Sequence, residues 1–195
     1  MKYDLPEKEN EILPNIPGFK SSSEIAFAEF EGFLKAEIVL TEALTHRTKF
    51  DLKYILQIHK LSLGELYSFA GKYRNVNMSK GGFPFAAARF LPETMKLFED
   101  EVLAKLVHKY TDADVLIKDI AVVHAELLVI HPFREGNGRT ARILANLMSR
   151  KQGYGPLMFD KIDEQGMEVY IAAVQKAAAK EYGPMVELIS SVFPN

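Results

Sequence analysis

The sequence predicts an all-α domain with one small β-hairpin, and three observations support this prediction. Apolar residues recur at helical spacing along most of the 195 residues. Residues 73–86 depart from that spacing, because apolar residues alternate from Tyr73 to Met78 and a Gly81-Gly82 pair follows. The length suits one domain with a single sizeable core. We therefore expect a compact helical domain with a flap at residues 73–86.

The helices have identifiable starts and stops. Residues 1–20 contain three prolines and are expected to form an irregular arm before a domain at 21–195. A serine among residues 21–23 is expected to cap a helix from Ile25 to Leu44, and Asp51 is expected to cap the next. Later helices are expected over Pro92 to Lys109, Asp114 to Ile130, Gly138 to Gly153, Glu164 to Lys180 and Pro184 to Val192.

The composition excludes several functional classes. Lys and Arg number 24 against 26 Asp and Glu, and this net charge of −2 argues against a broad nucleic-acid-binding surface. The absence of cysteine excludes disulfides, thiolate metal sites and cysteine nucleophiles. The amino-terminal stretch "MKYDLPEKENEILPN" lacks the apolar run of a signal peptide, and no stretch approaches a membrane span. We expect a cytoplasmic protein, and the sequence does not indicate its oligomeric state.

The stretch "HPFREGNGRTAR", residues 131–142, combines features that suit a bound phosphate. Gly136 and Gly138 allow a sharp turn and a close approach of backbone N–H groups to a ligand. A helix is expected to begin there, and its unpaired amides and dipole favour anions. Arg139 and Arg142 are three residues apart on that helix, so both guanidinium groups can reach one ligand. This arrangement favours a polyphosphate, although each feature alone also occurs in ordinary turns and solvated helices.

An acid and a base complete this stretch. Glu135 would repel a phosphate unless a divalent cation lies between them, and Mg²⁺ is commonly held by one carboxylate together with substrate phosphates. His131 is a candidate general base, since the ordinary pKa of histidine is near neutral pH. Together these residues indicate transfer of part of a nucleotide to a hydroxyl group. Among the other histidines, we expect His124 to be hydrogen-bonded in the core, and the remaining three to lie at the surface or its boundary: His46, His59 and His108.

The stretch from His131 to Arg142 resembles the signature of the Fic (filamentation induced by cAMP) family, His-Pro-Phe-x-Asp/Glu-Gly-Asn-Gly-Arg-x-x-Arg, at every specified position. Upstream, "IHKLSLGELYSFAGKYRNVNMSKGGFPF" is similar to the second common stretch of that family. The resemblance runs from about Ser23 to Val192 and implies the compact helical Fic fold with a hairpin flap.

The resemblance also implies an activity, namely transfer of AMP from Mg-ATP to a Ser, Thr or Tyr hydroxyl of a target protein with release of pyrophosphate. His131 would deprotonate the hydroxyl, Glu135 would bind Mg²⁺, and Phe133 would anchor the loop in the core. The nucleotide phosphates would contact Gly136, Asn137, Gly138, Arg139 and Arg142, with Lys80 and Gly81 nearby. The flap, comprising Ser79, Lys80, Gly81, Gly82 and Phe83, would align the target segment by strand-like pairing.

Related activities remain as alternatives. Doc-like phosphotransferases carry a larger residue at the position of Gly138, and relatives that transfer phosphocholine carry alanine at the position of Gly136. Both glycines therefore favour AMP transfer. Reversal of the modification is a further family activity. A non-catalytic helical interaction module would keep the fold without the reaction.

Two expectations concern regulation and the base pocket. Many Fic proteins are inhibited by a glutamate in the pattern Ser/Thr-x-x-x-Glu-Gly/Asn, which pairs with the second motif arginine. Glu31 and Gly32 match the end of this pattern, but Phe27 replaces its hydroxyl residue, so the alternative is a separate antitoxin-like partner, as in a toxin–antitoxin pair. The adenine pocket is expected to draw on residues 167–180, including Tyr170.

Overall fold

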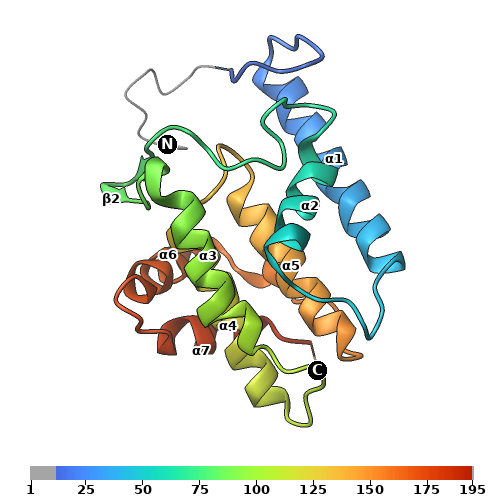
Figure 1. Cartoon of the computed structure of the whole chain (residues 1–195), viewed down its shortest axis with the longest axis vertical. Coiled ribbons are helices and arrows are strands. Elements are labelled where there is room, and N and C mark those ends of the chain that lie inside the picture. Colours follow the sequence, from blue (N-terminus) through green and yellow to red (C-terminus); the bar gives the residue numbers. More distant parts are fainter. Residues whose placement is uncertain (1–11, 195) are drawn as a thin grey trace.

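The computed structural model describes residues 12–194 and confirms the all-α fold with one small hairpin (Figure 1). The α-helices of this part of the chain are α1 (Ser22–Glu42), α2 (Leu52–Leu63), α3 (Leu91–Glu101), α4 (Ala113–Ile130), α5 (Asn137–Lys151), α6 (Glu164–Ala177) and α7 (Gly183–Val192). The hairpin consists of β1 (Ser79–Lys80) and β2 (Phe83–Pro84). Short 3₁₀ turns are η1 (Ala88–Phe90), η2 (Leu103–Lys105) and η3 (Phe159–Lys161).

Helix α4 forms the centre of the fold. It packs against α3, α5, α6 and α7, and its apolar residues are distributed around the helix, as is typical of a fully enclosed helix. Leu116, Ile120 and Leu127 have no exposed surface. Helix α5 packs beside α4 and also contacts α1 and α2, which lie together on the other side of the molecule (Figure 1). The connection between α4 and α5, residues 131–136, is thereby held between two buried helices.

Local sequence signals explain the placement of α1 and α2. Ser21 caps α1, and Glu24 completes the capping box by accepting a hydrogen bond from the Ser21 N–H. A Cβ atom at Gly32 would lie 2.0 Å from the Ser62 carbonyl oxygen, so glycine at this position permits the close approach of α1 to α2. Asp51 caps α2 through the Tyr54 N–H, as expected.

The expected irregular arm falls partly within the described residues. Residues 12–20 form no helix or strand, and the Asn15 side chain closes a turn by bonding both backbone groups of Phe19. The Ile16 N–H donates to the Leu66 carbonyl, which attaches this segment to the turn that follows α2. Residues 1–11 lie outside the described part of the chain.

Two expected helix ends are wrong. The helix expected to continue to Lys109 ends at Glu101, because Val102 adopts φ −119° and the chain turns into η2, which buries Leu103. Helix α6 ends at Ala177 rather than at Lys180, whose φ of 64° is left-handed. Neither end carries a proline, and the sequence therefore gives no local signal for these two bends.

The expected flap contains a short hairpin with two residues in each strand and a two-residue turn. Lys80 pairs with Phe83 across the strands, and Gly81 and Gly82 have φ of 55° and 76°. Positive φ at both central residues matches the type I′ turn that suits the twist of paired strands. The Gly81-Gly82 pair thus forms this turn without steric strain. No helix among residues 12–194 is long and apolar enough to cross a bilayer.

Candidate functional site

The loop between α4 and α5 has an unusual and well-supported backbone. His131 ends α4 in a left-handed conformation, with φ 53° and ψ 59°, and Gly136 precedes α5 with φ 79°. The Asn137 side chain joins the two ends of the turn, because its Oδ1 accepts from the Phe133 N–H and its Nδ2 donates to the Phe133 carbonyl, each at 2.8 Å. Asn137 was expected to contact phosphates. In the structure, it supports the loop.

The two motif glycines have different surroundings. A Cβ atom at Gly136 would lie 2.9 Å from Phe33 Cζ and 3.0 Å from Leu63 Cδ1. Gly136 is therefore required by both its φ and its packing. At Gly138, a Cβ atom would meet nothing within 4 Å, and the φ is not positive. Folding alone does not require glycine at 138, and the site keeps open space there.

His131 is buried beneath the flap. Its ring stacks on Phe85 with centroids 3.8 Å apart, and only 7% of the residue is exposed. Burial, followed by the nearby charges of Arg74 and Lys80, lowers the pKa of His131 to about 3. Its Nδ1 lies 3.2 Å from the Leu128 carbonyl, which can only accept, so Nδ1 carries the proton and the lone pair is on Nε2.

Arg74 fastens the flap to the loop. Its backbone N–H donates to Pro132, and its Nε donates to the His131 carbonyl at 2.8 Å. The two terminal nitrogens donate to the Val76 and Ala86 carbonyls, which flank the hairpin. One buried guanidinium thus connects both sides of the flap to the residue expected to act as base. Arg74 belongs to the upstream stretch that resembles the family, but its spacing there predicts no role for it.

The expected position of His59, at the surface or its boundary, is wrong. His59 has no exposed surface, and its ring stacks on Phe133 at 3.8 Å. The Gly71 N–H donates to Nδ1, so Nε2 carries the proton and donates to the Glu135 carbonyl at 2.9 Å. Burial lowers the pKa of His59 to about 4, and the neutral ring supports the loop from below. Phe133, fully buried, anchors the loop as expected.

Arg139 is held by two acids. Its NH2 group donates to Glu29 at 2.6 Å and to Glu135 at 3.2 Å, and its guanidinium lies 4.5 Å from the Phe33 ring centre. Glu29 is buried and also accepts from the Tyr67 hydroxyl at 2.8 Å. Desolvation and the Glu29 contact raise the pKa of Tyr67. Sequence reasoning missed Glu29, because an acid on the inner face of α1 looks like any helical glutamate.

Glu31, the expected inhibitory residue, does not contact the loop in this conformation. It is exposed and lines a separate surface pocket with Pro17, Lys35 and Leu61, whereas Glu29 faces the loop. Residues two apart on a helix point in nearly opposite directions, so only one of these glutamates can face Arg139. In this conformation Glu29, and not Glu31, pairs with Arg139, and inhibition of Arg142 by Glu31 stays a prediction.

Arg142 lies above the buried pair of His124 and Tyr170. Its guanidinium carbon is 5.9 Å from the Tyr170 ring centre and 5.5 Å from that of Phe159. The Arg142 Nε is buried and has no hydrogen-bond partner in the described part of the chain. His124 lies in the core as expected, hydrogen-bonded through Nε2 to the Tyr170 hydroxyl at 2.7 Å. Burial lowers its pKa to about 4.

Glu135 suits a hard cation only in combination with other ligands. Its Oε1 accepts from the Gly136 N–H and from Arg139, and the residue is 5% exposed. Within residues 12–194, no three His, Cys, Asp or Glu side chains gather as a metal cage. This donor set fits Mg²⁺, which takes one or two carboxylates and completes its octahedron with phosphate oxygens and water.

The structure brings most of the expected site residues together. The loop residues, from His131 to Arg142, lie at the start of α5, and Lys80 of the flap is near enough to contribute to the pKa of His131. Sequence reasoning missed Phe85, which covers the base, although it belongs to the quoted "SKGGFPF" stretch. The Tyr170 hydroxyl is engaged with His124, and its part in an adenine pocket stays a prediction.

Comparison with known proteins agrees with the motif. The model of the Fic/DOC family matches residues 49–149. The chain is 30% identical to Protein adenylyltransferase VbhT of Bartonella schoenbuchensis over 171 residues, which is 83% of this chain and 33% of that protein. It is 31% identical to Protein adenylyltransferase Fic of Aedes aegypti over 71% of this chain and 27% of the relative. The chain thus spans about a third or less of these curated relatives.

Solved structures share the fold over nearly the whole chain. The BepC protein of Bartonella tribocorum, solved with bound AMPPNP, superimposes with a TM-score of 0.79 at 21% identity and covers 97% of this chain and 96% of that one. The amino-terminal Fic domain of a Bartonella quintana effector, solved with ADP, gives a TM-score of 0.78 at 23% identity over 96% of this chain and 94% of that one. Motif, family match and fold agree, and the chain belongs to the Fic/DOC family.

Proposed function

We propose that this chain transfers AMP from ATP to a hydroxyl side chain of a target protein. The observation that carries the proposal is the position of His131, which ends α4 directly beside the glycine-bounded start of α5. A proton acceptor and an anion-binding helix start are thereby adjacent. Curated relatives named as protein adenylyltransferases, and fold neighbours solved with AMPPNP and ADP, support the same reaction class.

The reaction forms one bond and breaks one. The target oxygen attacks the α-phosphorus of ATP, and the bond from that phosphorus to the bridging oxygen of pyrophosphate breaks. The hydroxyl proton passes to Nε2 of His131, whose Nδ1–H is held by the Leu128 carbonyl. In-line attack requires pyrophosphate opposite the nucleophile, so orientation of the triphosphate decides which phosphorus reacts.

The two arginines have separate roles in this orientation. Arg142, with its orphan Nε, binds the terminal phosphate, because a buried donor without a partner gains from an anionic acceptor. Arg139, fixed by Glu29 and Glu135, presents its remaining donors to the phosphates in a defined direction. The open space at Gly138 favours AMP transfer, since a larger residue there would fill room next to the helix start.

Glu135 is the residue that would hold Mg²⁺. When bound, this ion supplies charge neutralisation of the phosphates. The amides at the start of α5 contribute positive potential from the other side. Asn137 keeps these amides in place through its two bonds to Phe133.

The flap receives the target protein. Ser79 to Phe83 form a short hairpin beside His131, and backbone pairing with an extended target segment would place a hydroxyl over the base. Because Phe85 covers the His131 ring, the target segment has to displace this ring or approach at its edge. Regulation by a separate inhibitory partner remains part of the proposal, and its acidic group would bind Arg142 in place of the phosphate.

Parallel incubations with α-labelled and γ-labelled ATP test the reaction. Purified protein is added to a cell lysate, and labelled protein bands are compared between wild type and His131→Ala. We expect label from the α position alone, and about a 10²–10⁴-fold slower transfer by the variant with ATP binding retained. Label from the γ position would establish phosphotransfer instead. Loss of ATP binding in His131→Ala would contradict the assigned division of roles.

A further inference from the structure

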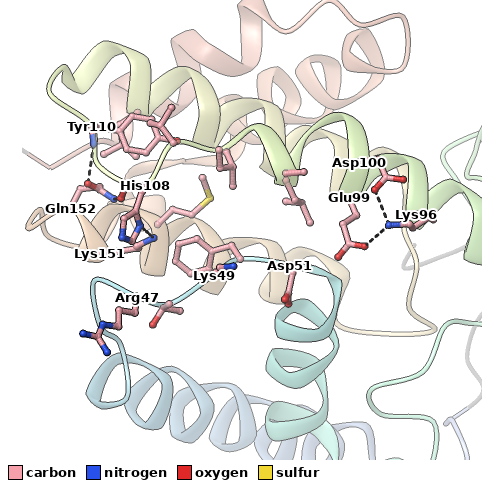
Figure 2. Close-up of a pocket in the computed structure, with 18 residues that line it drawn as sticks. Arg47, Lys49, Asp51, Lys96, Glu99, Asp100, His108, Tyr110, Lys151 and Gln152 are labelled. Carbon is pink, nitrogen blue, oxygen red and sulfur yellow. Dashed lines mark hydrogen bonds and ion pairs between the residues drawn. The ribbon is translucent and has the colours of Figure 1, made fainter.

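A second cavity lies far from the loop of residues 131–136. It has a volume of about 710 Å³ and is formed by the α1–α2 connection, the end of α3, residues 103–110 and the end of α5 (Figure 2). We refer to it as the distal cavity. Helix α5 begins at the loop and ends at this cavity, so about 20 Å of helix separates the two. The volume is within the range of small-molecule sites.

The floor of the distal cavity is apolar. Phe50, Leu103, Leu116 and Met148 line it, and each is at most 9% exposed. Val107 also lines the cavity, yet 48% of its surface is exposed, which is high for a branched apolar residue. An apolar molecule on this floor would cover the exposed surface of Val107 and gain packing contacts with the floor residues.

Three cations at the rim of the cavity have no acidic partner in the described part of the chain. The side chains of Arg47 and Lys49 make no ion pair or hydrogen bond within residues 12–194. Among the described residues, the polar and cation–π contacts of the Lys151 ammonium group are limited to the Nδ1 atom of His108, at 3.4 Å, and the face of Phe50, at 5.4 Å. Burial lowers the pKa of Lys151, because the charged ammonium group is partly removed from water. A bound anion would stabilise this charged form and so offset the cost of its burial.

The acids of the cavity are already engaged. Glu99 accepts from the Leu52 N–H and from Lys96, and Asp100 accepts from Lys96 at 2.7 Å. Asp51 caps α2. Figure 2 shows Glu99, Asp100 and Lys96 grouped at one end, whereas Arg47, His108 and Lys151 lie at the other. The unbalanced charge at that other end is positive.

From this juxtaposition we propose that the distal cavity binds an organic anion with an apolar body. The body lies on Phe50, Leu103 and Met148, and the anionic group lies among Arg47, Lys49 and Lys151. Both features are needed, because exposed single ion pairs contribute little and the apolar floor alone selects no charge. The site is independent of the proposed AMP transfer.

Matched probes test the charge requirement. 2-Naphthoate, 2-naphthylmethanol and 2-naphthylmethylamine share one apolar body and differ in the head group, while 2-naphthyl phosphate distinguishes a phosphate head from a carboxylate. Backbone amide shifts are followed by NMR during titration of the full chain. We expect saturable shifts at Phe50, Val107 and Lys151 with an anionic probe. The alcohol and the amine are expected to bind at least about tenfold more weakly than the carboxylate.

Two exposed substitutions and a control complete the test. Lys49→Gln and Arg47→Gln are each expected to weaken binding of the anionic probe several-fold, whereas Lys118→Gln, an exposed lysine of α4 outside the cavity, leaves it unchanged. Equal affinity for all three head groups overturns the proposal. So does the lack of saturable shifts up to about 1 mM, or shifts confined to another surface.

Discussion

Replacement of Gly136 by alanine is expected to destabilise the protein strongly. The left-handed φ of 79° costs an alanine about 1–2 kcal/mol. Its methyl group would lie 2.9 Å from Phe33 and 3.0 Å from Leu63, and these neighbours are 6% and 0% exposed. Overpacking of this kind costs about 1–3 kcal/mol. We therefore expect a loss of about 3 kcal/mol, which lowers Tm by about 6–12 °C in a chain of this size.

Gly138→Ala is the matched control, because its methyl group meets nothing within 4 Å and the backbone is not left-handed. Alanine is the better helix former by about 0.5–1 kcal/mol, so the control keeps or slightly raises Tm. Denaturant unfolding of both variants gives the two free energies. A Gly136→Ala protein as stable as the control would refute the reasoning. A double-mutant cycle that combines Gly136→Ala with Phe33→Leu then separates steric overlap from backbone strain. The smaller leucine relieves the overlap with the alanine methyl group but leaves the strained backbone unchanged.

Four further predictions concern the same site. Because the pKa of His131 is about 3, its ring is neutral above that pH, and kcat/KM for transfer is expected to stay level from pH 8 to about pH 5; a midpoint near 6.5 would contradict this. The pKa values of His59 and His124 are about 4 in the folded protein and 6.5 in the unfolded chain. The free energy of unfolding is therefore highest above pH 6.5, and each histidine lowers it by about 2 kcal/mol when the pH falls to 5. Equal free energies of unfolding at pH 7.5 and pH 5 would contradict this prediction. Arg74→Lys keeps the charge but not the forked donors, and we expect faster hydrogen exchange at the hairpin with slower transfer; unchanged exchange would mean that the flap does not depend on this side chain. Glu29→Gln is expected to slow transfer about 10–100-fold by releasing Arg139, and faster transfer would instead identify Glu29 as a restraint.

Local signals predicted the elements well where the chain carries caps, prolines or glycines. The Ser21 capping box, the Asp51 cap and the Gly81-Gly82 turn all act through neighbouring residues, which a sequence displays directly. The end of α3 at Glu101 could not be predicted this way, because Val102 turns in response to packing of Leu103 in the core.

The site was predictable in its loop but not in its supports. The residues from His131 to Arg142 are contiguous, so a single motif predicted them together. His59, Arg74 and Glu29 reach the loop from positions 57 to 110 residues away in the chain. Such contacts depend on how α1, α2 and the segment before the hairpin pack against the loop, and no spacing in the sequence reports them.

The contacts of α1 with the loop determine how far the chain can be shortened. The family match covers residues 49–149 and leaves out α1, yet α1 supplies Glu29 to Arg139 and Phe33 to the underside of Gly136. A fragment cut at the boundaries of that match would leave one guanidinium without its buried counterion and a glycine turn facing solvent. Expression and engineering of a minimal unit should therefore start upstream of Ser21, which begins the cap of that helix.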